Sequence, residues 1–595
     1  MKKNSKVLVF ITVCLLIVSV IALSSKSSTA GAEKKRKTAD ASEKQESTDA
    51  EESKTTGEKE KSENLIVLIG DGMGPAQVTL SRLYAQEYEE IEKLYMDDYL
   101  VGTNSTRADR SLDGEESGVV TDSAASGTAF ATGNKTYNGA VSVTNEMIAK
   151  PVASVLEAAK EAGKSTGLIS TARLTHATPA VYASHVRSRD NENAIASQYL
   201  EAGVDVLIGG GESYFVGEEK EAKFGESKRE DGQNLVKAFK EKGYKIAHNK
   251  EELQKVEGDQ LLALLSDSHV PYGLDRDESI PSLKEQLEKA LEILEGNDEG
   301  FVIMVEAGRI DHAGHANDIH SVVRELLEFD EAFKTAVDYA EKTGNTSVIA
   351  TADHETGGLT IGSNDVYEVY FEAFKNVTAS SEVIGKELEE AKSPDEIKEI
   401  MKKYAGIEDL SKQELAQLEK ADGKESSREG VFNVIIAERS NIGWTGHGHT
   451  GVDVGVYGYG PAAELLFGFN DNTDFAKAGA TALGLDMEKA SKALQVKYAY
   501  PLYEESENGE LLFPVEGLEE LLGIHVKVSE KNIDVSGNDV RFSVKQDAKE
   551  VQIDQATYGI VVKEKQLYIP FELLQNLATP KITWDGLSER IVIES

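Results

Sequence analysis

Uninterrupted apolar runs recur along the chain, and the clearest two are residues 65–69 and 301–305. Neither run contains a polar break, as expected of parallel strands that are covered on both faces. Further strand-like runs are residues 167–170, 204–208, 261–265, 347–350 and 452–457. Helical patterns lie between them, and residues 320–342, for example, carry an apolar stripe at helical spacing. The alternation predicts an α/β fold over residues 63–498, with a doubly wound, mostly parallel sheet and helices on both faces.

Two further segments differ in character from this predicted domain. Residues 366–428 interrupt the alternation with charged helical sequence, which predicts a helical surface insertion. Residues 499–595 contain short alternating runs at 524–528, 540–544 and 591–593, which predict a small β-rich accessory domain.

The first residues have the pattern of a secretory signal: a basic start, an apolar run over residues 7–23 and small residues at 30–32. We expect cleavage after Ala32 and a secreted or cell-surface protein. The apolar run is just short of a membrane span, so an uncleaved N-terminal anchor stays open as an alternative. Residues 33–62 hold no aliphatic side chain larger than alanine, which predicts a disordered, charged tether.

Charge and cysteine content limit the possible partners and metal ligands. The chain has 64 basic and 104 acidic residues, a net charge of −40, which argues against nucleic acid as a partner. Cys14, inside the predicted signal, is the only cysteine. The mature protein therefore has no disulfide and no thiolate ligand, and any transition-metal site must use histidines and carboxylates.

Such residues follow the predicted strands. Asp71 comes after the first strand, and Glu306, Asp311, His312 and His315 come after the strand at 301–305. If a helix begins after Gly308, the four-residue spacing of Asp311 and His315 places both on one face, as two ligands of one cation require. His176 and Thr178, Asp353 and His354, and His449 lie beside three other strands. Ligands in such sheets gather outside the carboxyl ends of the strands, so we expect one metal centre there. The alternative is an acidic loop with surface histidines.

The small residues 121–129 predict the first turns of a buried helix. Ser123 would face unpaired N–H groups and the positive end of the helix dipole, which favour an alkoxide or a bound phosphate. The alternative is that Asp122 or Ser123 merely caps the helix. Five other histidines have no further candidate ligands beside them in the sequence. We expect them to be structural or surface residues: His185, His248, His269, His320 and His525.

Six motifs, in order, are GDGMG, TDSAASGTA, HATPA, VEAGRIDHAGH, TADHETGG and HGHTG. Together they resemble the bacterial alkaline phosphatase family over roughly residues 64–498. The resemblance implies phosphomonoester hydrolysis through a phosphoserine, at a centre of two Zn²⁺ and one Mg²⁺. Ser123 matches the nucleophile, and Arg189 falls at the spacing of the phosphate-binding arginine.

The resemblance also implies ligand sets. Asp311, His315 and His449 match the first zinc site. Asp71, Asp353 and His354 match the second, where Ser123 is also counted as a ligand. Asp71, Thr178 and Glu306 match the third, magnesium site. His176 and His312 stand where the best-known bacterial member has Asp and Lys, so we expect His176 at the third metal, which another divalent ion could then occupy, and His312 beside the substrate phosphate.

The segments 567–571 and 582–586 resemble the N-terminal-like domain of some copper amine oxidases, which implies a cell-envelope or accessory role and not amine oxidation. Two alternatives to a monoesterase stay open. One is a related metallohydrolase acting on diesters or sulfates, and the other is a non-catalytic, metal-binding envelope protein. The expected partners are small phosphate monoesters. The sequence leaves the natural substrate and the oligomeric state open, with a homodimer among the alternatives.

Overall fold

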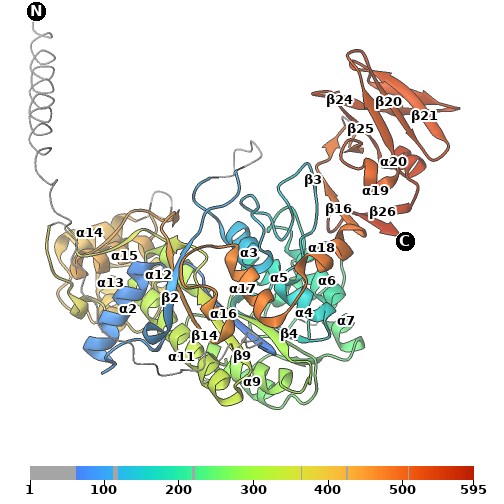
Figure 1. Cartoon of the computed structure of the whole chain (residues 1–595). Helices are drawn as coiled ribbons and strands as arrows, with labels where there is room; N and C mark the ends of the chain where they lie inside the picture. The colour runs from blue at the N-terminus through green and yellow to red at the C-terminus, as the bar shows by residue number, and fades with distance from the viewer. Residues whose placement is uncertain are drawn as a thin grey trace, which may run out of the picture. The chain divides into compact units, whose positions relative to one another are not determined.

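The computed structural model describes residues 62–594 apart from residues 111–117, 218–221, 364, 422, 424–425 and 507 (Figure 1). The predicted signal at 1–32 and all but the last residue of the predicted tether lie outside the described residues. Among the helices of the described ranges, none has the length and apolarity that crossing a membrane requires.

A ten-stranded sheet forms the centre of the fold. β14 is antiparallel to both of its neighbours, and the other pairs in the sheet are parallel. In spatial order the strands are β15 (Gly468–Asp471), β2 (Leu100–Ser105), β14 (Val454–Tyr459), β9 (Thr346–Thr351), β1 (Asn64–Gly70), β8 (Phe301–Ala307), β4 (Ser165–Arg173), β5 (Val206–Gly210), β7 (Leu261–Leu264) and β6 (Lys245–Ala247). The predicted α/β class with a mostly parallel sheet is confirmed.

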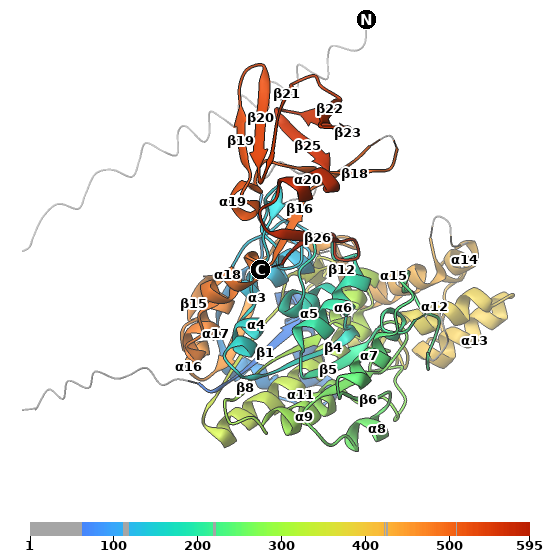
Figure 2. The ribbon, with the colours of Figure 1, turned by 90° about the vertical axis from the view of Figure 1, so that its right-hand side faces the viewer.

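Helices cover both faces of this sheet, which explains the unbroken apolar runs. Along β1, Leu65, Val67 and Ile69 pack into one hydrophobic cluster, whereas Ile66 and Leu68 pack into another on the opposite face. The first cluster includes residues of α3 (Ser123–Thr132), α5 (Ala177–Ala183), α6 (Glu192–Ala202) and α17 (Asp474–Leu483). The second includes residues of α2 (Pro75–Tyr88), α9 (Leu283–Leu294), α10 (Arg309–Ala316) and α11 (Ile319–Thr343). In Figure 2, α9 and α11 lie on one side of the strands, and α5 and α6 lie on the other.

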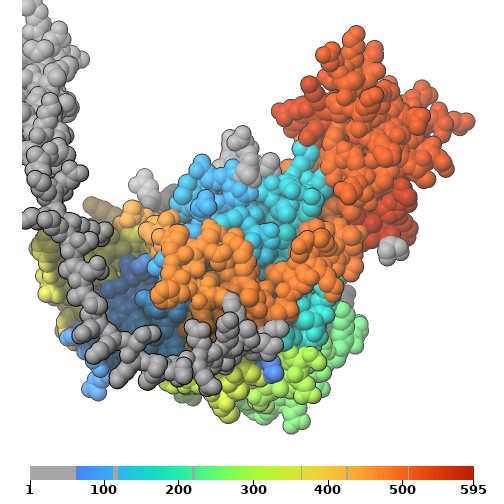
Figure 3. Space-filling model, in the orientation of Figure 1, coloured from blue at the N-terminus to red at the C-terminus, as the bar shows by residue number. Residues whose placement is uncertain are grey.

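Segments distant in sequence meet around α3. α17 packs against α3, and β15 pairs with β2. In the space-filling view the orange residues of α16 (Pro461–Glu464) and α17 accordingly lie against blue and cyan residues from the first part of the chain (Figure 3). The helix that carries Ser123 is therefore enclosed, and every residue of α3 is buried.

The strands at the margin of the sheet differ most from expectation. β2, β6 and β15 were not predicted, because their sequences are short or polar and their side chains are partly exposed. β14 begins two residues later than predicted, since Val452 is exposed and precedes the paired segment. The helix predicted at 320–342 is α11, which begins after its N-cap residue Asp318, whose side chain accepts the N–H of Ser321.

The two-stranded ribbon β10 (Glu355–Thr356) and β13 (His449–Thr450) lies outside the large sheet and pairs the segment after β9 with the one before β14. The register sets Thr356 opposite His449. Residues of two predicted motifs, TADHETGG and HGHTG, are therefore held side by side by backbone hydrogen bonds.

The helical segment predicted at 366–428 contains η3 (Phe371–Ala373), α12 (Ser381–Glu390), α13 (Pro394–Ala405) and α14 (Lys412–Lys420), and it continues through α15 (Arg428–Ser440). Its apolar side chains form one cluster with Tyr84 of α2 and Val323 of α11. The segment thus has a core of its own that rests on the helices of one sheet face.

The C-terminal residues are rich in antiparallel strands, as predicted. β19 (His525–Val528), β20 (Asn532–Gly537) and β21 (Val540–Lys545) form one sheet, and β26 (Lys581–Asp585) pairs with β27 (Arg590–Glu594). Their apolar residues build a further cluster with α20 (Phe571–Leu577). β16 (Tyr498–Pro501) pairs with both β27 and β3 (Ile148–Ala149), and Tyr500 is buried against Ala140 and Val143.

Candidate metal centre

The candidate centre lies where neighbouring strands of the large sheet end. β1 and β8 pair in parallel with Ile69 opposite Glu306, so Asp71, two residues further on, emerges beside Glu306. β9 flanks β1 on its other side and is followed by Asp353 and His354. All four of these polar side chains are fully buried. Strand pairing therefore gathers residues that are far apart in the sequence, as expected at this edge of a parallel sheet.

The first group of ligand atoms comes from Asp311, His315 and His449. α10 places Asp311 and His315 one turn apart, with His315 Nε2 3.3 Å from Asp311 Oδ2. His449 Nε2 lies 3.5 Å from Asp311 Oδ1 and 3.1 Å from His315 Nε2. His449 Nδ1 donates to the carbonyl oxygen of Thr121 at 2.9 Å, so its Nε2 lone pair faces the group. This arrangement could hold one cation.

The second group comes from Asp71, Asp353 and His354. His354 Nε2 lies 3.1 Å from Asp353 Oδ2 and 3.7 Å from Asp71 Oδ1. Burial, and next the charge of Asp353, raise the pKa of Asp71 well above its ordinary value. Both carboxylate oxygens of Asp71 accept no hydrogen bond within the described part of the chain. A divalent cation would relieve this concentration of negative charge.

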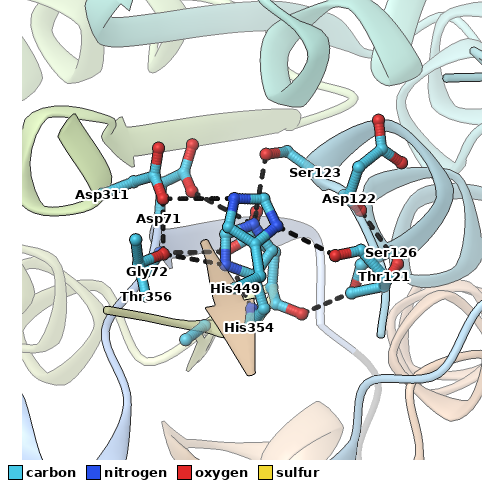
Figure 4. Close-up of polar contacts among 12 residues, drawn as sticks. Asp71, Gly72, Thr121, Asp122, Ser123, Ser126, Asp311, His354, Thr356 and His449 are labelled. Carbon is cyan, nitrogen blue, oxygen red and sulfur yellow. Dashed lines mark hydrogen bonds and ion pairs between the residues drawn. The ribbon is translucent and has the colours of Figure 1, made fainter. Parts of the chain in front are cut away.

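The hydroxyl of Thr356 connects the first two groups. It donates to Asp311 Oδ1 and lies 3.2 Å from His354 Nδ1. Figure 4 shows Thr356 between these side chains, below Asp71. The sequence contained Thr356 inside the motif TADHETGG, but nothing in its spacing indicated this bridging position.

The third group comes from Asp71, His176 and Glu306, so Asp71 belongs to two groups. Thr178 lies next to Glu306 and is buried at the start of α5. Burial raises the pKa of Glu306 to about 7, while its Oε2 accepts the hydroxyl of Ser170 from β4. Three oxygen-bearing side chains and one imidazole could hold a cation here, and a set made mostly of hard oxygens suits Mg²⁺.

Ser123 is the first residue of α3 and is buried. Its Oγ lies 3.3 Å from His354 Nε2 (Figure 4), so it borders the second group. Ser126, one turn further along the helix, instead donates its hydroxyl to the carbonyl oxygen of Asp353 at 2.8 Å. Ser123 is thus the serine that faces the ligand groups, at a helix N-terminus with unpaired N–H groups.

Asp122 has more than the capping role that the sequence suggested. Its Oδ1 accepts the N–H of Ala125 at 2.9 Å, which caps α3. Its Oδ2 accepts Arg189 Nη1 at 3.1 Å and the N–H of Gly139 at 3.0 Å. Asp122 therefore ties the residue before Ser123 to Arg189.

Three histidines lie together beside the third group. The ring centroids of His176 and His312 are 5.6 Å apart. His269 joins them, 4.2 Å from His312 and 5.9 Å from His176. The expectation that His269 lies apart from the candidate site residues was wrong. Its position after the predicted strand 261–265 could have indicated that it lies near the centre, because that strand ends at the same edge of the sheet.

Two of the other histidines without predicted ligand roles contact different groups. His185 is buried and pairs with Glu157, with 2.9 Å between Nε2 and Oε1. His248 contacts Glu212 and the carbonyl oxygen of Leu264. These contacts agree with structural roles.

Comparison with known proteins shows the family to which the chain belongs. The family model described as alkaline phosphatase matches residues 62–485. Alkaline phosphatase 3 of Bacillus subtilis is 39% identical over 432 residues, which cover 70% of this chain and 87% of that protein. The repressible alkaline phosphatase of Saccharomyces cerevisiae is 38% identical over 439 residues, covering 67% of this chain and 76% of that protein.

Among solved structures, the cold-active alkaline phosphatase of a psychrophilic Shewanella species is 37% identical to this chain. The alignment covers 71% of this chain and 99% of that one, with a TM-score of 0.63. Sequence and fold thus point to the same relatives. The chain is an enzyme of the alkaline phosphatase family.

Proposed function

We propose that this enzyme hydrolyses phosphate monoesters through a phosphoserine at Ser123 and releases inorganic phosphate. The observation that carries the proposal is the position of Ser123 Oγ, 3.3 Å from His354 Nε2, on a helix whose cap residue Asp122 also binds Arg189. A nucleophile, a phosphate-binding guanidinium and three candidate cation sites therefore lie around one point.

In the proposed reaction, Ser123 Oγ attacks phosphorus and the bond to the leaving alkoxide breaks. Water then cleaves the phosphoserine, which returns the serine hydroxyl and releases inorganic phosphate. Arg189 binds two non-bridging oxygens in its planar fork, a geometry that lysine lacks. Asp122 orients that fork, and the N-terminus of α3 favours the negative charge next to Ser123.

We further propose that two zinc ions belong to the first two ligand groups and a magnesium ion to the third. Asp311, His315 and His449 would hold one zinc, and Asp71, Asp353 and His354 the other, next to Ser123. When bound, two such ions supply Lewis-acid stabilisation to the attacking and leaving oxygens of an in-line displacement. Three His or Asp ligands per zinc leave a position open, the pattern of a catalytic site.

His176 makes the identity of the third ion a separate question, because an imidazole ligand shifts preference away from Mg²⁺. One solved structure bears on it. A variant of the alkaline phosphatase from the Antarctic bacterium TAB5, in which a histidine is replaced by aspartate, is described with Mg bound in its M3 site. That chain is 25% identical to this one, with a TM-score of 0.51. We propose that His176 plays the part of that histidine.

We also propose that residues 1–32 direct export and that residues 499–595 serve location at the cell envelope. Every proposed ligand lies before Tyr498, which leaves the C-terminal strands free for such a role. The homodimer stays a prediction. Sedimentation of the purified protein would measure its oligomeric state directly.

The experiment that tests the function compares an aryl phosphate monoester, the matching diester and an aryl sulfate as substrates of the purified protein. We expect the monoester to be hydrolysed fastest by a wide margin, with activity lost to a chelator and restored by Zn²⁺ and Mg²⁺. Faster turnover of the diester or the sulfate would support the related metallohydrolase instead. Tight zinc binding without turnover of any ester would support the non-catalytic alternative.

A further inference from the structure

Each of the three clustered histidines contacts one arginine. The atom pairs are Arg189 Nη2 and His176 Nε2 at 2.9 Å, Arg309 Nη1 and His312 Nδ1 at 3.2 Å, and Arg173 Nη1 and His269 Nε2 at 2.7 Å. A guanidinium can only donate, so the imidazole nitrogen in each contact must accept. In His312 and His269, which belong to no proposed ligand group, the second nitrogen then carries the proton, and each of these two imidazoles is held as one neutral tautomer.

A carboxylate fixes each arginine in turn, and Arg173 is held most firmly. Its Nε and Nη2 form a two-point contact with Glu192, at 2.8 Å to Oε2 and 2.9 Å to Oε1. Glu192 also accepts the hydroxyl of Thr175. The third nitrogen, Nη1, is thereby aimed at His269. Glu192, Arg173 and His269 thus form a chain of contacts that ends in the histidine cluster.

His269 continues this chain to His312. The two rings meet edge to face, with centroids 4.2 Å apart and an interplanar angle of 61°. The remaining ring nitrogen of His269, Nδ1, is buried and has no hydrogen-bond partner among the described residues. A buried donor without an acceptor points to a water molecule or an anion oxygen as its partner.

We propose that His269 is a positioning residue of the phosphate site, an inference that rests on the proposed function. Oriented by Arg173 and Glu192, it holds the ring of His312 in place beside the bound phosphate. It thereby sets the affinity for the phosphate group rather than taking part in bond making. The competing explanation is that His269 only fills space between β7 and α10.

Replacing His269 by phenylalanine keeps a ring of similar size and removes both nitrogens. In the metal-loaded enzyme we expect the Kd of inorganic phosphate, measured by calorimetry, and the KM of an aryl phosphate to rise about fivefold, the effect of one lost hydrogen bond. kcat should change much less. His269→Gln, whose amide oxygen can still accept from Arg173, should recover part of the affinity.

His248→Phe is the matched control, because His248 also follows a strand of the large sheet but lies outside the cluster. It should leave the Kd of phosphate unchanged. If His269→Phe fails to fold, Arg173→Lys removes the fork that orients His269 and should weaken phosphate binding in the same way. An unchanged Kd in either folded variant would overturn the positioning role. A wild-type protein that hydrolyses no monoester would overturn the proposed function instead.

Discussion

The imidazole rings of His354 and His449 stack with centroids 3.5 Å apart and planes within 17° of parallel. The two residues belong to different ligand groups, His449 to the one with Asp311 and His354 to the one with Asp71. The two groups are therefore direct neighbours, which a displacement spanning two metal ions requires. Of these two imidazoles, His354 is the one that Ser123 Oγ contacts.

Ser123→Ala should abolish the phosphoenzyme and nearly all turnover, while zinc content stays close to that of the wild type. Loss of a nucleophile removes the covalent route, and the His and Asp ligands remain. Rapid quenching with a radiolabelled monoester measures the phosphoenzyme, and elemental analysis measures zinc. Ser126→Ala is the matched control, because Ser126 donates to the backbone of Asp353. A dead Ser126 variant beside an active Ser123 variant would contradict the assignment.

The double variant His176→Asp with His312→Lys should bind phosphate at least about threefold more tightly and need less excess Mg²⁺. Burial lowers the pKa of His312 to about 3, so the native side chain is neutral where lysine adds a positive charge. Aspartate replaces a nitrogen ligand by oxygen, which favours Mg²⁺. Phosphate inhibition and activity across a Mg²⁺ titration measure both effects. Unchanged values in both assays would mean that the two histidines only pack around the site.

Removing residues 499–595 should leave monoesterase activity per folded molecule within about twofold of the full chain, since all proposed ligands precede the cut. Stability should fall, because this cut deletes Tyr500, which is fully buried and whose carbonyl oxygen accepts Arg187 Nη1 at 2.8 Å. Truncation after Leu502 keeps Tyr500 and should melt several degrees higher than the shorter protein. Truncated enzyme that folds and binds zinc but lacks activity would show that the C-terminal residues complete the site.

A buried carboxylate in α11 should make stability fall with rising pH. Burial, and next the charge of Glu328, raise the pKa of Glu325 to about 7 from an ordinary value of 4.5. Because the folded-state pKa is the higher one, the folded state prefers protonated Glu325. This stabilisation is complete below about pH 4.5 and is lost as the pH rises through about 7.

Glu325→Gln should therefore raise the melting temperature by a few degrees at pH 8 and leave it nearly unchanged at pH 4.5. The amide oxygen can still accept the N–H of Gly273, which Glu325 Oε1 accepts at 2.7 Å. Glu288→Gln, on the exposed part of α9, is the control and should have no such pH dependence. An equal gain at both pH values would argue against titration of Glu325.

The central strands and their ligands could be predicted because both follow from local sequence. An unbroken apolar run such as residues 301–305 indicates a strand buried on both faces, and the polar residue that follows must leave the sheet at its carboxyl edge. The spacing of Asp311 and His315 likewise required only that α10 form. Parallel pairing then brings Asp71 and Glu306 together without any further information.

Contacts that depend on loops were not predictable in this way. His269 follows β7, but the sequence does not show that residues 266–268 return it to His312. Asp122 looked like an ordinary N-cap, and its second oxygen meets Arg189 only because the loop at Gly139 folds beside it. Strands near the margin of the sheet, such as β2, lack an apolar signature, since their side chains are partly exposed and backbone pairing alone defines them.

The β10–β13 ribbon links the first two ligand groups through the backbone. Thr356 stands opposite His449 in the ribbon, and two residues before Thr356 the same segment carries His354. One candidate ligand of the first group thus lies in β13, and one of the second group lies directly before β10. A substitution that shifts the ribbon should displace His354 and His449 at once. Substitutions in the ribbon are therefore expected to alter both ligand groups together and not one alone.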